Sequence, residues 1–256
     1  MVKDNLQSTL PVIERSLEFF RPHHLELRKR LITVFLAVIG CTGIAYIFAE
    51  KIAAFFISPL FAASPLVYKM VYTNLPEAFL AYIKLAFLVG LIASMPVVLY
   101  QLWIFVAPGL KKNEKKLAVL IVFWATLLFS GGAVFAFFVV LPKMLSYFMS
   151  YAGAGLEPLP KLGLYLTFVA RTILAFGIAF QIPFLMVMAG KANFVTAAYF
   201  RRKRIYFYMA IVVLSFLLTA GDFVATGLMA MPLFLLYESG IFLSALFNRK
   251  KTAKVN

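Results

Sequence analysis

The chain has 256 residues, of which 63% are hydrophobic and 14% charged, and it carries a formal net charge of +15. This composition, together with a positive mean hydropathy, excludes an ordinary soluble domain and indicates a polytopic membrane protein. The basic residues cluster beside apolar runs, where lipid headgroups and membrane topology explain them, so we expect no nucleic-acid partner.

The first part of the chain, residues 1–22, is a polar-to-amphipathic lead whose apolar positions favour a short surface helix. We do not expect a cleavable signal here, because the first long apolar run starts only at Leu31. Directly before this run the chain reads His-His-Leu-Glu-Leu-Arg-Lys-Arg-Leu. This stretch places the carboxylate of Glu26 among bases at the edge of the membrane.

Six apolar runs approach or exceed the ~20 residues needed to cross the hydrocarbon core. Because the loop 50–76 after the first run is broken by prolines, we expect it to form a folded cap and not a span. The second run should tilt or kink near Pro96, the third should stop at Pro142, and the fifth is short. The runs cover residues 31–49, 79–107, 117–141, 162–190, 205–219 and 223–247.

These runs predict an all-α integral membrane protein with one six-helix transmembrane domain over residues 23–247, followed by a basic tail at 248–256. Most of the 25 Lys and Arg residues fall in the two end segments and in the loops 108–116 and 191–204. Cytoplasmic loops retain bases, so both termini are predicted to be cytoplasmic.

This orientation places Glu26 and Glu114 on the same face, the latter within a second basic loop. Each acid could simply form a local ion pair, which contributes at most ~1 kcal/mol when exposed. Alternatively, the two carboxylates could receive an incoming cation. Arginine is the favoured cation in that case, because its planar guanidinium binds a carboxylate bidentately. The residues alone leave both interpretations open.

Several motifs of the chain, in order and spacing, resemble the TatC family over about residues 23–247. They include His-Leu-Glu-Leu-Arg-Lys-Arg-Leu at 24–31, Tyr-Gln-Leu-Trp at 100–103, Phe-Val-Ala-Pro-Gly-Leu at 105–110, Gln-Ile-Pro at 181–183 and Tyr-Glu at 237–238. The resemblance implies the core subunit of the twin-arginine translocase, which exports folded proteins across the bacterial cytoplasmic (inner) membrane using the proton-motive force. It also implies a concave bundle with short fifth and sixth helices.

The resemblance further implies roles for individual residues. Glu26 and Glu114 are similar to the carboxylates that receive the arginine pair of a signal peptide. Phe105 is similar to an aromatic position near that site, although interfacial anchoring explains it equally well. Pro59 resembles a position that shapes the external cap.

Contacts with partner subunits are implied at three further residues. Gln181 resembles a polar position that meets partner subunits, although an interhelical hydrogen bond is the alternative. Thr219 and Asp222 flank a turn similar to the docking edge for the single-helix proteins TatA and TatB. The family usually has proline between them, where this chain has Ala220 and Gly221, which puts the rigidity of the turn in doubt. Hetero-oligomers and self-association are expected.

Other functional classes have weaker support. A small-solute secondary transporter would commonly show internal repeats with paired broken helices, and the two halves of this chain differ in loop length and proline placement. The sequence contains no phosphate-binding loop, metal-ligand spacing or nucleophile constellation, and Cys41 is its only cysteine. We therefore expect no enzyme activity, cofactor or metal. Lys84 and Arg171, which lie within apolar runs, are interpreted as snorkelling structural residues.

Overall fold

The computed structural model describes residues 26–63, 67, 69–106, 115–151, 158–191, 195–219 and 221–252. This part of the chain is mainly helical, and its β pairing is an isolated bridge between Val71 and Lys161. Among the described residues, five helices are long and apolar enough to cross a membrane, and a sixth, shorter apolar helix covers Arg204–Leu218. The predicted all-α class is confirmed, and the lead 1–22 lies outside the described residues.

The first described helix covers Glu26–Ile47. The elements after it are α2 (Ala49–Ala63), α3 (Leu75–Val106), α4 (Lys115–Phe135), a π-helical turn (Ala136–Val140), α5 (Leu141–Met149), α6 (Leu162–Ala179), α7 (Gln181–Lys191), α8 (Ala197–Arg202), α9 (Arg204–Leu218) and α10 (Phe223–Thr252).

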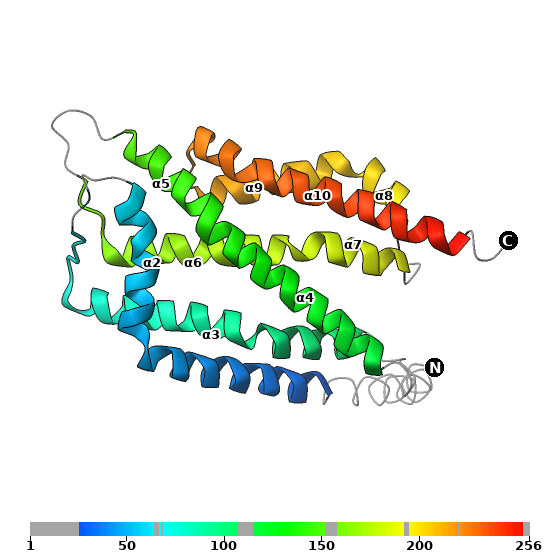
Figure 1. Ribbon diagram of the computed structural model, residues 1–256, viewed down its shortest axis with the longest axis horizontal. Helices are drawn as coiled ribbons and strands as arrows, with labels where there is room; N and C mark the ends of the chain where they lie inside the picture. Colours follow the sequence, from blue (N-terminus) through cyan, green and yellow to red (C-terminus); the bar gives the residue numbers. More distant parts are fainter. Residues whose placement is uncertain are drawn as a thin grey trace, which may run out of the picture.

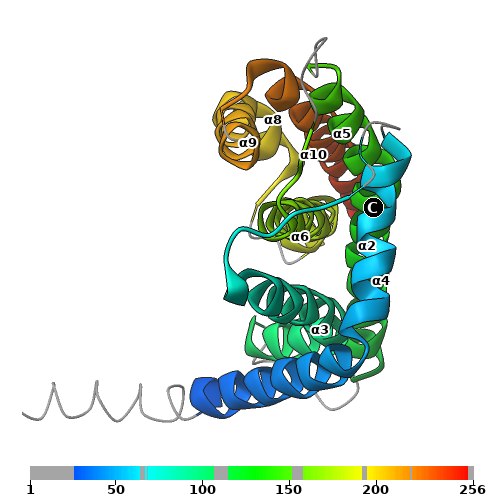
Figure 2. The same ribbon diagram turned by 90° about the vertical axis from the view of Figure 1, so that its left-hand side faces the viewer.

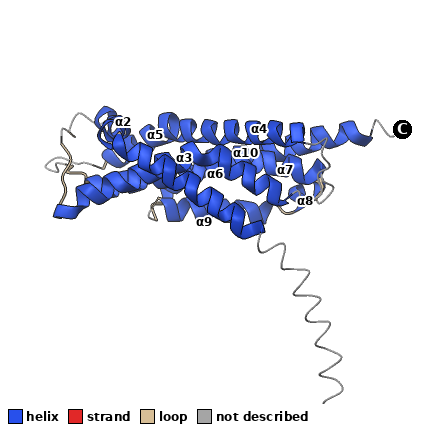
Figure 3. Ribbon diagram, turned by 90° about the horizontal axis from the view of Figure 1, so that it is seen from below, coloured by secondary structure: helices blue, strands red, loops and turns tan. Residues whose placement is uncertain are grey.

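The long helices lie side by side, and α2 crosses them at one end of the bundle (Figure 1). We call this the cap end; α3 and α6 begin there. We call the opposite end the basic end, because the first helix begins there with Arg28, Lys29 and Arg30, and α8 carries Arg201 and Arg202 there. Every element drawn in Figure 3 is helix or loop.

Seen along the bundle, the helices form a curved wall (Figure 2). The first helix stands at one tip of the curve and α8 with α9 at the other, while α3 and α6 lie between them. This arrangement leaves one hollow side, as the predicted concave bundle requires.

The loop after the first helix differs from the prediction, because residues 49–63 form helix α2 in spite of Pro59. Proline lacks the N–H that would bond to the carbonyl four residues earlier, which is that of Phe55. The Ser58 hydroxyl donates to this same carbonyl over 2.7 Å. The side chain thus replaces the missing backbone bond, and buried Phe56 and Leu60 hold the helix against the bundle. The expected cap is present, but it is helical.

The third span also differs, because it continues through Pro142 to Met149. The π-helical turn directly before this proline shifts the hydrogen-bond register, with the Leu141 N–H donating to the Ala136 carbonyl. A π-turn widens the helix locally and so lets it accept the proline ring, which would otherwise clash with the preceding turn. The helix therefore need not stop there.

The last two spans differ in length. Helix α9 has 15 residues, as the sequence predicts. Helix α10 has 30 residues, and its apolar part is Phe223–Leu246 with 24 residues. The expected shortness is therefore right for the fifth span and wrong for the sixth, because the helix continues beyond its apolar run into the basic C-terminal segment.

Small residues allow the helices to approach closely, as is usual in membranes, where water does not drive association. A Cβ built on Gly90 of α3 would lie 2.6 Å from the Cα of Thr42 in the first helix. One built on Gly132 of α4 would lie 2.7 Å from the Phe176 carbonyl oxygen of α6. These contacts fix the spacing of the curved wall.

Candidate functional site

The carboxylate of Glu26 lies at the start of the first helix, at the basic end. Its Oε1 atom accepts a hydrogen bond from Nη2 of Arg30, one helical turn later. The Glu26 side chain is 52% exposed and that of Arg30 is 15% exposed. Because residues four apart share one helix face, Arg30 forms the local pair and not Arg28. The local ion pair that the sequence left open is therefore present.

Arg30 also connects this site to α3. Its Nη1 atom donates to the backbone carbonyl of Gln101 over 3.4 Å. The second oxygen of Glu26 accepts no hydrogen bond from the part of the chain that the structure describes. Within the described ranges, this oxygen on a half-exposed side chain is open to a further donor.

The end of α3 supplies a feature that sequence reasoning missed. The indole Nε1 of Trp103 is shielded from solvent and has no acceptor among the described residues. The sequence does not single out this indole, because a tryptophan near the end of a span is typical of interfacial anchoring. Phe105 lies in the last turn of α3, but its side chain is outside the described part, as is all of Glu114. Whether Glu26 and Glu114 come together therefore stays a prediction.

The Gln181 side chain lies inside the fold at the start of α7. Its Nε2 donates to the Ala125 carbonyl of α4 over 3.0 Å, and the residue is 8% exposed. The interhelical hydrogen bond considered as the alternative is therefore present. A partner contact at this position stays a prediction.

Thr219 and Asp222 stabilise the turn between α9 and α10. The Thr219 hydroxyl lies 2.8 Å from that of Thr226, and the residue is 3% exposed. Asp222 Oδ1 accepts from the Ala225 N–H over 2.7 Å, which makes Asp222 the N-cap of α10. It also accepts from the Tyr147 hydroxyl over 3.1 Å, a contact that sequence reasoning missed because 75 residues separate the two.

Gly221 explains how this turn closes without a proline. Its φ is +90°, a conformation that side chains with a Cβ rarely adopt. Its N–H donates to the Phe216 carbonyl over 3.0 Å. The turn is therefore held by backbone bonds and by the Asp222 cap, while Leu217 and Phe223 beside it are 68% and 83% exposed.

A third polar cluster joins α9 to α10 near the basic end. Arg204 Nη2 donates to Glu238 Oε2 over 2.6 Å, and the Tyr208 hydroxyl donates to Glu238 Oε1. The cluster places the carboxylate of Glu238 toward the basic end, where an acid is less costly than in the middle of a membrane. No group of three or more potential metal-ligating side chains gathers in the described ranges.

Comparison with known proteins identifies the family. The model described as "Sec-independent protein translocase protein (TatC)" matches residues 22–232. The TatC protein of Desulforapulum autotrophicum is 34% identical over 232 residues, which cover 91% of this chain and 86% of that relative. TatC of Escherichia coli K12 is 36% identical over 225 residues, covering 88% and 87%.

A solved structure agrees with the fold. The crystal structure of a twin-arginine translocase receptor, TatC, matches with a TM-score of 0.80 at 34% identity, covering 88% of this chain and 99% of that one. The resemblance noted from the sequence motifs and the cupped arrangement of six helices are both confirmed. This chain belongs to the TatC family of Sec-independent protein translocase proteins.

Proposed function

We propose that this chain is the receptor subunit of a twin-arginine translocase and that its basic end binds the arginine pair of a signal peptide. The observation that carries the proposal is the carboxylate of Glu26, which is half exposed and whose ion-pair partner among the described residues is Arg30. Because the Glu26 side of this pair is open to solvent, the pair contributes about 1 kcal/mol, so an incoming guanidinium can displace it.

The contacts of Arg30 support an exchange of partners. When a substrate arginine binds Glu26, Arg30 retains the Gln101 carbonyl as an acceptor on α3. The guanidinium of Arg30 therefore keeps one hydrogen bond during the exchange. The substrate guanidinium then forms two parallel bonds to the carboxylate, which a single Nη2 contact from Arg30 does not provide. Glu114 receives the second arginine, and Phe105 lies beside the same site.

The orientation of the chain in the membrane, and with it the direction of transport, follows from the distribution of basic residues. The basic end is the cytoplasmic end in this proposal, with both termini inside, because bases are retained on the cytoplasmic side. The membrane is the bacterial cytoplasmic (inner) membrane, and the proton-motive force drives the export of folded substrates.

The partners are single-helix proteins of the TatA and TatB kind. They dock at the edge formed by α9 and the turn before α10, where Leu217 and Phe223 are exposed. Since Thr219 is buried, the contact at this edge runs through its exposed neighbours, while Asp222 maintains the shape of the turn. Gln181 can contact a partner helix only when α4 and α7 separate enough to break its hydrogen bond to the Ala125 carbonyl. Self-association of the chain completes the assembly.

The test is capture of the purified chain by an immobilised twin-arginine signal peptide. Glu26→Gln and Glu114→Gln should each weaken capture about tenfold, because a charge-assisted bidentate contact is lost. Glu50→Gln is the matched control, since Glu50 is an exposed acid at the cap end, and it should bind as the unaltered chain does. Equal capture of all four proteins would overturn the assignment.

A further inference from the structure

Two cationic side chains within the spans have no role in the proposed recognition of signal peptides. Lys84 of α3 and Arg171 of α6 are both exposed, and neither forms an ion pair with a described residue. A charge at membrane depth is costly unless it meets water, protein groups or lipid headgroups. A binding partner for both cations is therefore expected.

The two cations lie at the same depth, because α3 and α6 are joined where they begin. The Leu162 N–H donates to the Val71 carbonyl over 3.0 Å, directly before α6. Oε1 of Glu77, in the first turn of α3, accepts from the Gly163 N–H over 3.4 Å. Lys84 follows Glu77, and Arg171 follows Gly163, by about two helical turns. At ~1.5 Å per residue, each cation lies roughly 10–12 Å below this junction.

The two cations also face the same side of the curved wall. On α6, exposed residues recur every seven positions at Leu164, Arg171 and Ile178, which places them in one stripe. On α3, the exposed stripe contains Leu80, Lys84 and Phe87. Helices α3 and α6 pack against each other and both pack against α4. Their exposed stripes therefore open toward the hollow side in Figure 2.

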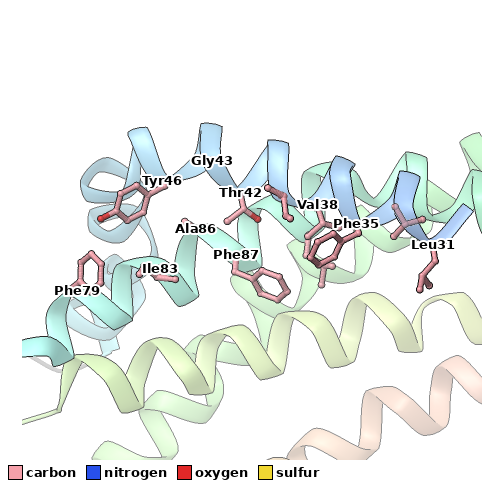
Figure 4. A pocket seen from close by; sticks show the side chains of 13 residues that line it. Leu31, Phe35, Val38, Thr42, Gly43, Tyr46, Phe79, Ile83, Ala86 and Phe87 are labelled. Carbon is pink, nitrogen blue, oxygen red and sulfur yellow. The ribbon is translucent and has the colours of Figure 1, made fainter. Parts of the chain in front are cut away.

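An apolar groove passes the stretch of α3 that carries Lys84, and it extends from Phe79 and Tyr46 on the cap side to Leu31. Lys84 itself is not one of its lining residues. The groove lies between the first helix and α3, has a volume of about 950 Å³, and includes Phe35, Val38, Tyr46 and Ile83 in its lining. Phe87 (Figure 4) lines its α3 side three residues after Lys84. Leu91, seven residues after Lys84 on the same helix, lines it as well. A hydrocarbon chain could therefore run from the level of Lys84 toward the middle of the membrane along this groove.

The short helix α9 explains how a headgroup reaches this depth. Its 15 residues span about 22 Å, against roughly 30 Å of hydrocarbon. Figure 1 shows the α9–α10 turn set inward from the level at which α3 and α6 begin. A bilayer that matched α9 on the hollow side would thin at the cap end. Thinning there would bring lipid phosphates toward the level of Lys84 and Arg171.

We propose that Lys84 and Arg171 together bind the phosphate of an acidic phospholipid in the cap-end leaflet, with one of its acyl chains in the groove between the first helix and α3. The positive charge of the pair selects an anionic headgroup, and the apolar lining selects a ligand that carries a hydrocarbon chain. The site differs in position from the Glu26 region, so neither assignment depends on the other.

Native mass spectrometry of the purified full chain, titrated with phosphatidylglycerol or with phosphatidylcholine, tests the proposal. The chain should prefer phosphatidylglycerol. Lys84→Gln and Arg171→Gln should each weaken binding about fivefold and the double variant about 25-fold, as expected for two bases at a lipid surface. The exposed lysines Lys51 and Lys143 provide matched controls, and their Gln variants should bind normally.

Two results would overturn the proposal. One is equal binding of phosphatidylglycerol by the unaltered chain and by the double variant. The other is competition by millimolar inorganic phosphate, which would show that the site takes a free anion and not a lipid. If the double variant fails to fold, as judged by circular dichroism, the test rests on the two single variants, and unchanged phosphatidylglycerol binding in both would overturn the proposal. The charge-exchanged variant, Lys84→Arg with Arg171→Lys, should retain binding because it keeps both charges.

Discussion

Two adjacent glycines of α4, Gly131 and Gly132, differ in how much room a side chain would find there, because only Gly132 lies against α6. A Cβ at Gly132 would lie 2.7 Å from the Phe176 carbonyl oxygen and 2.9 Å from the Phe180 Cβ. A Cβ at Gly131 would meet nothing within 4 Å. Gly132→Ala should therefore destabilise the protein, and Gly131→Ala should not.

The magnitude follows from two opposing terms. Alanine is favoured over glycine in a helix interior by about 1 kcal/mol, and both variants gain this term. Only Gly132→Ala adds overpacking, which costs typically about 1–3 kcal/mol. The Phe176 carbonyl cannot move alone, because it accepts the Phe180 N–H over 2.9 Å. We therefore expect Gly132→Ala to be less stable than Gly131→Ala by about 1–3 kcal/mol.

The assay is reversible unfolding of each variant in mixed micelles with increasing denaturing detergent, followed by circular dichroism. The difference between the two free energies of unfolding removes the propensity term common to both variants. Equal stability of the two variants would refute the inferred contact between α4 and α6.

Three further predictions concern polar contacts. Arg30→Gln should tighten capture by a twin-arginine peptide by up to about fivefold, since it removes the competing cation at Glu26; weaker capture would instead mean that Arg30 positions the carboxylate. A cysteine at exposed Leu217 should crosslink to a single-helix partner more efficiently than one at buried Thr219, and the reverse order in a crosslinking gel would count against the docking edge. Glu238→Gln should speed amide hydrogen exchange in the first turns of α9, because it weakens the contact with Arg204. Peptide capture should stay normal, and an unchanged exchange rate would contradict this prediction.

The sequence predicts the spans well because each needs only a long apolar run. The prediction fails where a local hydrogen bond or a change of helix register lets the helix continue through a proline. Pro59 and Pro142 are both helix breakers by composition, but a Ser58 hydroxyl bond and a π-turn accommodate them. Neither device is visible before the helix register is known.

The candidate site shows a similar limit. Glu26 can be identified from its basic surroundings, but its partner depends on where the helix begins. The apolar run starts at Leu31, whereas the helix already includes Glu26. This earlier start places Glu26 and Arg30 on one face. The contacts of Gln181 with Ala125 and of Asp222 with Tyr147 join distant parts of the chain, and only the tertiary fold brings them together.

The most direct test of the central claim is a double-mutant cycle between Glu26 and the signal peptide. Binding of a twin-arginine and a twin-lysine peptide is measured for the unaltered chain and for Glu26→Gln. If Glu26 receives a substrate guanidinium, the preference for arginine over lysine should fall about tenfold in the variant, because a bidentate pair is lost. An unchanged preference would contradict the assignment of Glu26 to the recognition site.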